Sequence, residues 1–593
     1  MQLTVLDWIV IAAYFAFNLL IGLYFRKRAT QSVSDFFVSG RNASWWLAGT
    51  SMVATTFAAD TPLAVTGLVA RNGIAGNWLW WSMAFSGMLT VFFYARLWRR
   101  AGVLTDVEFA EIRYSGKPAT FLRGFRALYL GLPINLIIMG WVNLAIVKIM
   151  MLVLGINRVE ALGIALGIMA ITASISTLSG LWGVLWTDLF QFVLKMGMVI
   201  LLAVFAVEAT GGLSALKQGL VAVEQTRHST GSVLSFLPDL HSTWMPFITF
   251  FTYIAVNWWA SWYPGAEPGG GGYVAQRIFS AKNEKHSVLA TLWFNVAHYA
   301  LRPWPWILVA LVALVRFKDD PSFAADPESG YIRILISDFP VTLRGLMLAA
   351  FAAAYMSTIG TQLNWGASYL VNDVYRRFMA KDKGERHYVN VAQGATILLM
   401  VLSAIVTYYM DSIGGAWKFL IAIGAGTGLV YILRWFWWRI NAWSEISAMA
   451  SAFITSTALQ YAFRLDESKP EDFAWLLIFT VLITSAVWLT VTFLTKPEPE
   501  EKLLSFYRRV RPNAALWKPI AKLAPDIIPQ KDGLFNLVDW LSGVAMVYSF
   551  LYGSGQVILG DTTTGIASIA VGAVFGAVIY FDLNKRGWET LAG

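Results

Sequence analysis

Long apolar blocks recur along this chain, and their length limits what it can fold into. Each block holds about twenty residues, which as a helix is enough to cross a bilayer of ~30 Å. Only 14% of the 593 residues are charged and 57% are hydrophobic, whereas soluble domains carry about 25% charge. The sequence therefore predicts an all-α polytopic membrane protein with about fifteen transmembrane helices. The spans are expected at 6–25, 46–71, 76–97, 124–153, 158–178, 181–208, 244–264, 286–316, 341–370, 391–410, 414–437, 443–463, 472–494, 536–559 and 564–583.

Charge alternates between successive loops. Cations concentrate at 26–28, 96–100, 276–286 and 375–387, whereas 410–415 and 560–565 are poor in them. Because cytoplasmic loops carry the excess of Lys and Arg, this alternation predicts an external N-terminus and an internal C-terminus. The expected location is a plasma membrane, with a bacterial cytoplasmic membrane favoured. The basic segment 496–533 is expected to lie along the cytoplasmic face.

Composition excludes several kinds of function. The chain has no Cys and five His without paired spacing, which excludes disulfides and thiolate metal sites and disfavours a metal centre. The net charge of +9 fits cytoplasmic loops and indicates no nucleic-acid partner. We find no pairing of nucleophile and base, so an enzyme is not expected.

The stretch PGAEPGGGGYVAQR at 264–277 combines two prolines with five glycines. A phosphate-binding loop requires GxxxxGK[ST] after a strand, and neither is present. A linker is disfavoured because polar flanks are missing. The remaining interpretation is a break within a membrane helix.

Polar residues in three spans mark candidate sites, because such residues are costly in a membrane. The second span carries Thr55, Thr56 and Asp60 ahead of a Thr-Pro pair, which predicts an interrupted helix. The sixth span buries Asp188, and the ninth contains a Ser-Thr run. Hydroxyls and carbonyls without an Arg or Lys suit a desolvated Na⁺. Taken singly, however, such hydroxyls also bond back to helix carbonyls or join neighbouring helices.

Several motifs together resemble the sodium:solute symporter family: DFFVSGRNASWWLAGTSMVATTFAAD, GLWGVLWTDLFQFVLKMG, QRIFSAKNEKHS, AAFAAAYMSTIGTQLN and RINAWSEISAM. The resemblance covers roughly residues 5–460. It implies a LeuT-like core of two inverted five-helix repeats, with one extra helix before it and about four after it. The expected divisions are 1–45 for the N-terminal helix and link, 46–210 and 211–440 for the repeats, and 441–593 for the peripheral helices. PGAEPGGGG then breaks core helix 6, the counterpart of core helix 1.

The resemblance also implies where ions bind. The family's Na⁺ position corresponds to the carbonyls of Ala54, Phe57 and Ala354 and the hydroxyls of Ser357 and Thr358. A second Na⁺ position, found in some members, corresponds to Asp188 and Thr361. Gly360 stands where those members have Ser, which disfavours a second ion.

The substrate site carries over less well. Thr61, Trp80 and Gly424 stand where the family's sugar carriers have Gln, Glu and Gln, and His298 replaces a lysine, which disfavours the same sugar pose. His298 and Arg302 lie four residues apart on one helix face, with Glu267 as a plausible partner. They form a polar network for substrate, or else Arg302 extends to the outer interface and pairs structurally. The candidate substrate residues are Thr61, Trp80, Trp258, Trp259, Glu267, Tyr273, His298, Arg302 and Gly424, with Trp81 as a further wall.

The expected function is import of a small polar organic solute by sodium-coupled symport. Sodium is the coupling ion, and binding alternates between the two sides of the membrane. Aromatic walls with polar clamps favour a sugar or polyol, whereas a free Arg favours a carboxylate or amino acid. The alternatives are a sodium-dependent sensor or a channel-like protein. The expected partners are the solute and the lipid bilayer, with no obligatory protein partner.

Overall fold

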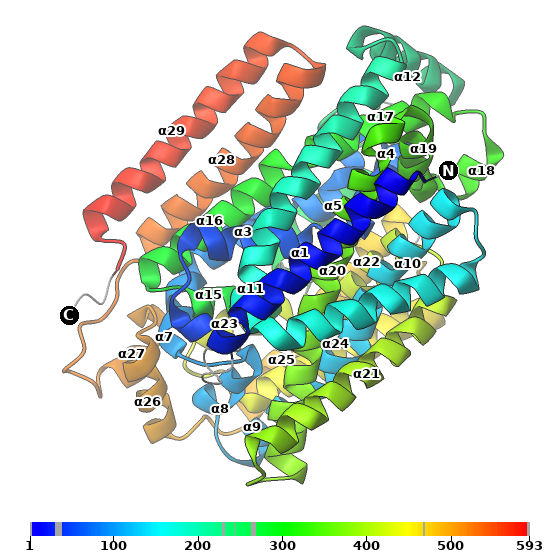
Figure 1. Cartoon of the computed structure of the whole chain (residues 1–593). Coiled ribbons are helices and arrows are strands. Elements are labelled where there is room, and N and C mark those ends of the chain that lie inside the picture. Colours follow the sequence, from blue (N-terminus) through cyan, green and yellow to red (C-terminus); the bar gives the residue numbers. More distant parts are fainter. Residues whose placement is uncertain are drawn as a thin grey trace.

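The computed structural model describes residues 3–29, 38–227, 232–242, 245–261, 268–466 and 469–589. This part of the chain is helical and holds no strand, only isolated bridges such as Ala43 with Ala281. Its helices pack into one bundle, with α28 and α29 along one flank (Figure 1). The all-α polytopic architecture predicted from the apolar blocks is confirmed.

The α-helices between the N-terminus and Ala260 vary widely in length. They are α1 (Val5–Ala29), α3 (Trp45–Thr56), α4 (Asp60–Asn72), α5 (Trp78–Trp81), α6 (Ala84–Leu89), α7 (Ala95–Ala101), α8 (Phe109–Arg113), α9 (Gly116–Tyr129), α10 (Asn135–Leu154), α11 (Arg158–Ala209), α12 (Leu213–Arg227), α13 (Phe247–Thr252) and α14 (Trp258–Ala260).

The α-helices from Gly272 onward complete the bundle. They are α15 (Gly272–Ser280), α16 (Glu284–Val296), α17 (Pro303–Arg316), α18 (Pro321–Ala325), α19 (Gly330–Asp338), α20 (Arg344–Ser368), α21 (Glu385–Tyr409), α22 (Ile413–Gly424), α23 (Gly428–Phe436), α24 (Ala442–Ala462), α25 (Pro470–Leu494), α26 (Glu500–Val510), α27 (Lys518–Ala521), α28 (Gly533–Leu559) and α29 (Thr562–Arg586).

Ten described helices are long and apolar enough to cross a membrane, and two bent helix pairs raise the number to twelve. The other three expected spans are not among these twelve. The span at 76–97 consists of short helices, the one at 244–264 contains a short apolar helix, and the one at 443–463 matches α24. The segment α11 contains two of the expected spans. Its two halves pack against the same turn of α20, through contacts of Ala165 with Tyr355 and of Asp188 with Ser357.

A helix break occurs after Thr56, where the sequence predicts one: between α3 and α4 the chain bends by 58°. Helix α14 ends at Ala260 and α15 begins at Gly272, and the described residues between them, 261 and 268–271, are not helical. Residues 264–267 of the predicted break at PGAEPGGGG lie outside the described residues. Before α15, Gly269 and Gly270 have φ of +85° and +78°, a region where residues with a Cβ are strained. Glu267 lies outside the described residues.

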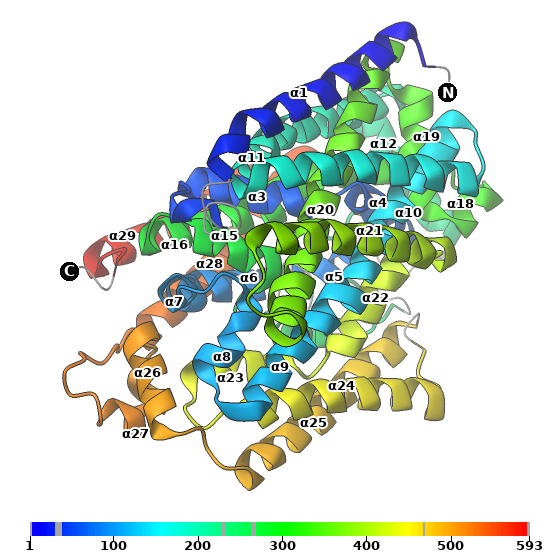
Figure 2. The same ribbon diagram turned by 60° about the horizontal axis from the view of Figure 1, so that its bottom comes forward.

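The C-terminal part is tied to the core by hydrogen bonds. The indole of Trp304 in α17 donates to the Leu551 carbonyl of α28 at 3.0 Å, and the Tyr548 hydroxyl donates to the Trp81 carbonyl at 2.8 Å. Helices α26 and α27, within the expected surface segment 496–533, lie at one end of the bundle (Figure 2). One face of α26 is buried through Leu503, Phe506, Tyr507 and Val510.

Candidate functional site

The centre of the candidate site is the break between α3 and α4. Helix α3 ends at Thr56 and α4 begins at Asp60, so the last carbonyls of α3 lack the partners that a continuous helix supplies. The macrodipole also concentrates negative partial charge at this end. The break therefore attracts cations, and the structure places three side-chain cations around it.

Lys195 of α11 occupies the position expected for the first Na⁺. Its Nζ donates to the Ala54 carbonyl at 2.8 Å and to the Phe57 carbonyl at 3.1 Å. The side chain is buried, with 1% of its surface exposed. These are two of the five oxygens expected to bind the ion. An ammonium and a Na⁺ cannot both bind these carbonyls, because two like charges in contact repel each other strongly away from water.

The other three expected Na⁺ ligands lie on α20, and two of them join it to its neighbours. The Thr358 hydroxyl donates to the Thr55 carbonyl at 2.8 Å and lies 3.2 Å from the Ala354 carbonyl. The Ser357 hydroxyl donates to Asp188 at 2.6 Å. All five expected ligands therefore gather where α3, α11 and α20 meet, and side chains of the protein take up their hydrogen bonds.

Arg277 of α15 occupies the second expected ion position. Its guanidinium lies 3.3 Å from the Thr361 hydroxyl and 3.9 Å from the Asp188 carboxylate. It also lies 3.3 Å from the Ser51 hydroxyl, which donates to Asp188 at 2.5 Å. Both Arg277 and Asp188 are 1% exposed. The buried carboxylate is thus paired with a cation of the protein.

The premise that these polar clusters contain no Arg or Lys is wrong. Lys195 was recognisable from the sequence, because it follows Asp188 by seven residues and so lies two turns along the same helix face. A lysine within a span also marks function by default. Arg277 carried no such local signal, since only the fold brings α15 against α3 and α11.

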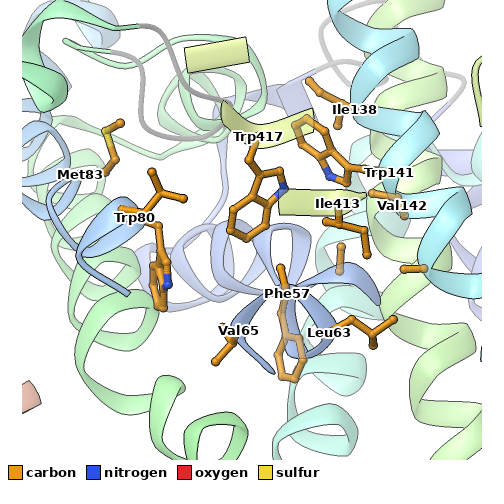
Figure 3. Packing of buried hydrophobic residues seen from close by; sticks show 14 of the residues in the cluster. Phe57, Leu63, Val65, Trp80, Met83, Ile138, Trp141, Val142, Ile413 and Trp417 are labelled. Carbon is orange, nitrogen blue, oxygen red and sulfur yellow. The ribbon is translucent and has the colours of Figure 1, made fainter. Parts of the chain in front are cut away.

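A cavity lies beside the break, with about 670 Å³ of space not filled by atoms, counting its opening. Its lining includes Trp80, Trp141 and Trp417. Figure 3 shows these three rings, with Trp80 apart from Trp141 and Trp417, and it also labels Phe57, which lines a neighbouring, smaller cavity. Five of the expected substrate residues line it: Thr61, Trp80, Tyr273, His298 and Arg302. Thr56, Asp60, Thr358 and Gln362 add polar atoms to the lining.

Arg302 points toward the helix break and away from the outer interface. It donates to the Val53 carbonyl at 3.2 Å and to the Thr56 hydroxyl at 3.0 Å. Its guanidinium also lies 2.5 Å from the Nδ1 of His298. A π-helical turn at Ala297–Leu301 separates α16 from α17 and presents His298 to the cavity. Arg302 is 1% exposed, so the expected extension to the interface does not occur.

Two acceptor atoms in the cavity wall have no hydrogen-bond partner within the described part of the chain. They are Oδ1 of Asp60 and Oε1 of Gln362, and both side chains are buried. Buried acceptors are almost always satisfied in folded proteins. The cavity is therefore suited to a molecule that brings hydrogen-bond donors.

The other expected substrate residues do not line this cavity. Trp258 stacks on Phe85, with ring centroids 5.4 Å apart, and the Trp259 indole donates to the Ala255 carbonyl at 2.6 Å. Trp81 is fully buried and stacks on Phe236. Gly424 lines a different, smaller cavity together with residues such as Arg126 and Tyr431.

Comparison with known proteins places this arrangement in a family. Residues 36–454 match the model of the sodium:solute symporter family. A sodium/glucose cotransporter of Vibrio parahaemolyticus is 25% identical over 83% of this chain and 91% of that protein. A sodium/mannose cotransporter of Bos taurus is 24% identical over 74% of this chain and 76% of that protein.

A solved structure shares the fold. A Na⁺-coupled sialic acid symporter, in a substrate-bound outward-open state, superposes with a TM-score of 0.64 at 20% identity and covers 84% of this chain and 99% of that one. This likeness supports the LeuT-like architecture implied by the sequence motifs. The chain thus belongs to the sodium:solute symporter family: it is a multi-pass membrane transporter and not an enzyme, and Na⁺ is its coupling ion.

Proposed function

We propose that the protein imports a small solute rich in hydroxyl groups, a sugar or polyol, together with Na⁺. The observation that carries this proposal is the pair of unpartnered acceptors, Asp60 Oδ1 and Gln362 Oε1, in the cavity beside the helix break. Solute hydroxyls donate hydrogen bonds to such atoms. The indole rings of Trp80, Trp141 and Trp417 offer apolar surface to the less polar faces of a ring.

A carboxylate solute fits this cavity less well. Asp60 brings a like charge to its wall, and a solute carboxylate supplies acceptors where donors are needed. Arg302 already donates to Val53, Thr56 and His298. An amino acid occupies an intermediate position, because its ammonium can donate to Asp60. The related glucose and mannose cotransporters agree with a hydroxyl-rich substrate.

The helix breaks support alternating access. In the proposed cycle, solute lies between the interrupted helices, and Na⁺ binds where α3 and α20 meet. A membrane potential of about 100 mV contributes ~2.3 kcal/mol for each charge moved. The cation-rich loops support an external N-terminus and an internal C-terminus in a bacterial cytoplasmic membrane.

A thermal-shift screen of the purified protein tests this proposal. Sugars, polyols, amino acids, carboxylates and nucleosides are compared in sodium and in choline chloride. A ligand at 100 times its Kd stabilises the protein by ~2.7 kcal/mol. We expect a sugar or polyol to raise Tm, more strongly in sodium, and its uptake into proteoliposomes to require a Na⁺ gradient. Stabilisation by carboxylates alone would contradict the assigned substrate class.

A further inference from the structure

We propose that Lys195 is a tethered cation that Na⁺ must displace, so that the ammonium and the ion occupy the Ala54 and Phe57 carbonyls in turn. This inference rests on the proposed Na⁺ position where α3 and α20 meet. It adds an internal competitor that belongs to this chain.

The geometry of the amino group supports this competition. Lys195 Nζ bonds both carbonyls, at 2.8 Å and 3.1 Å, and lies 5.1 Å from the centroid of the Phe57 ring. An ammonium and Na⁺ carry the same charge and are both satisfied by carbonyl oxygens. The tethered group is always at high effective concentration, because it is part of the protein.

The surrounding charges limit the site to one cation at a time. Arg277 and Arg302 already lie at the same end of α3, bonded to Thr55 and Val53 respectively. Asp188 and Asp60 are the buried carboxylates near them. A Na⁺ added beside an undisplaced Lys195 would bring four cations against these two carboxylates, in a region from which water is largely excluded.

A small cavity borders the ammonium and is lined by Lys195 together with Phe57, Ala354 and Val199. Its free space is too small for the whole side chain, so Lys195 leaves the carbonyls only when the neighbouring side chains or helices shift. In this structure the Lys195 ammonium connects α11 to the end of α3. The proposed Na⁺ would connect α3 to α20 in a similar way.

Binding of radioactive Na⁺ to the purified full-length protein tests this inference without any knowledge of the solute. The wild type is compared with Lys195→Met and Lys195→Gln in lipid nanodiscs, with choline keeping the ionic strength constant. Gln removes the charge and keeps an N–H donor, on a shorter side chain that ends in an amide. Lys148→Met is the control, because Lys148 of α10 is a partly buried lysine that pairs with Asp326 and Glu328 and lies away from the helix break.

We expect the half-saturating Na⁺ concentration to fall about tenfold or more in both Lys195 variants and to stay close to the wild-type value in Lys148→Met. Equal or weaker Na⁺ binding in the Lys195 variants, with normal binding in the wild type, overturns the inference and leaves sodium coupling intact. Binding that appears only in the variants supports Lys195 as the occupant and contradicts sodium coupling in the natural protein. Absence of binding in all of them overturns both.

Discussion

The carboxylate of Asp188 connects its own helix, α11, to three others. One of its oxygens accepts a 2.6 Å hydrogen bond from Ser357 of α20. Its second oxygen accepts from Ser51 of α3 at 2.5 Å and lies 3.9 Å from the Arg277 guanidinium of α15. Helices α3 and α20 are the pair that Na⁺ is proposed to connect, so this carboxylate fixes the relative position of the two ion-binding segments.

Replacement of Asp188 by Asn is expected to damage both stability and transport. Leaving Arg277 as an unpaired buried charge costs about 3–5 kcal/mol by analogy with broken buried ion pairs. Thermal unfolding and Na⁺-driven uptake are measured together. Glu208→Gln, an exposed position on the same helix, is the control and should match the wild type. A stable, fully active Asp188→Asn protein would show that the Arg277 interaction does not hold these helices.

Asp60→Asn separates solute binding from stability. Because Asp60 Oδ1 lacks a partner among the described residues, removing its charge should leave the free energy of unfolding unchanged or raise it by about 1–3 kcal/mol. Solute affinity should fall at the same time. Asp319→Asn, on an exposed side chain, serves as the control. A parallel loss of stability and affinity would instead indicate a structural role for Asp60.

Gly269→Ala tests the glycine-rich segment that precedes α15. The added Cβ would lie 2.9 Å from the Tyr94 ring, and φ of +85° costs a non-glycine residue roughly 1–2 kcal/mol. Uptake should fall and Tm should drop. Gly163→Ala is a suitable comparison, since nothing lies within 4 Å of that Cβ. Equal uptake by the two variants would mean that this backbone is not needed in its described form.

The sequence predicted the break between α3 and α4 because the cause of such a break is local. The glycine-rich run before Gly272 and the Thr-Pro pair after Asp60 both disfavour a continuous helix through the chemistry of adjacent residues. The apolar blocks likewise predicted the spans, including the two that lie in α11.

The cations around the break illustrate what sequence spacing cannot show. The sequence left two roles open for Arg302, substrate binding or extension to the interface. In the fold it donates a hydrogen bond to the Val53 carbonyl on another helix. Arg277 pairs with Asp188, although the two residues, 188 and 277, are 89 positions apart in the sequence. Such pairings depend on which helices become neighbours in the fold. The spacing of residues along the chain does not show which helices these are.

Acidification should weaken an ion-pair cluster centred on Glu111. Burial raises the pKa of Glu111, but hydrogen bonds and charge from Arg123 and Arg377 outweigh it and leave the pKa below 4.5. Glu111 bonds these arginines at 2.6 Å and 2.9 Å, linking α8 to α9 and to the segment Tyr369–Met379 after α20.

A carboxyl group whose pKa is lowered by folding stabilises the protein above its unfolded pKa, and that contribution disappears as the pH falls through the lowered value. We therefore expect Glu111→Gln to lower Tm at pH 7 and to reduce the further loss of Tm below pH about 4.5. Thermal unfolding across this range measures both effects, with Glu208→Gln as the surface control. If the variant and the wild type lose stability in parallel on acidification, the Glu111 cluster does not contribute to it.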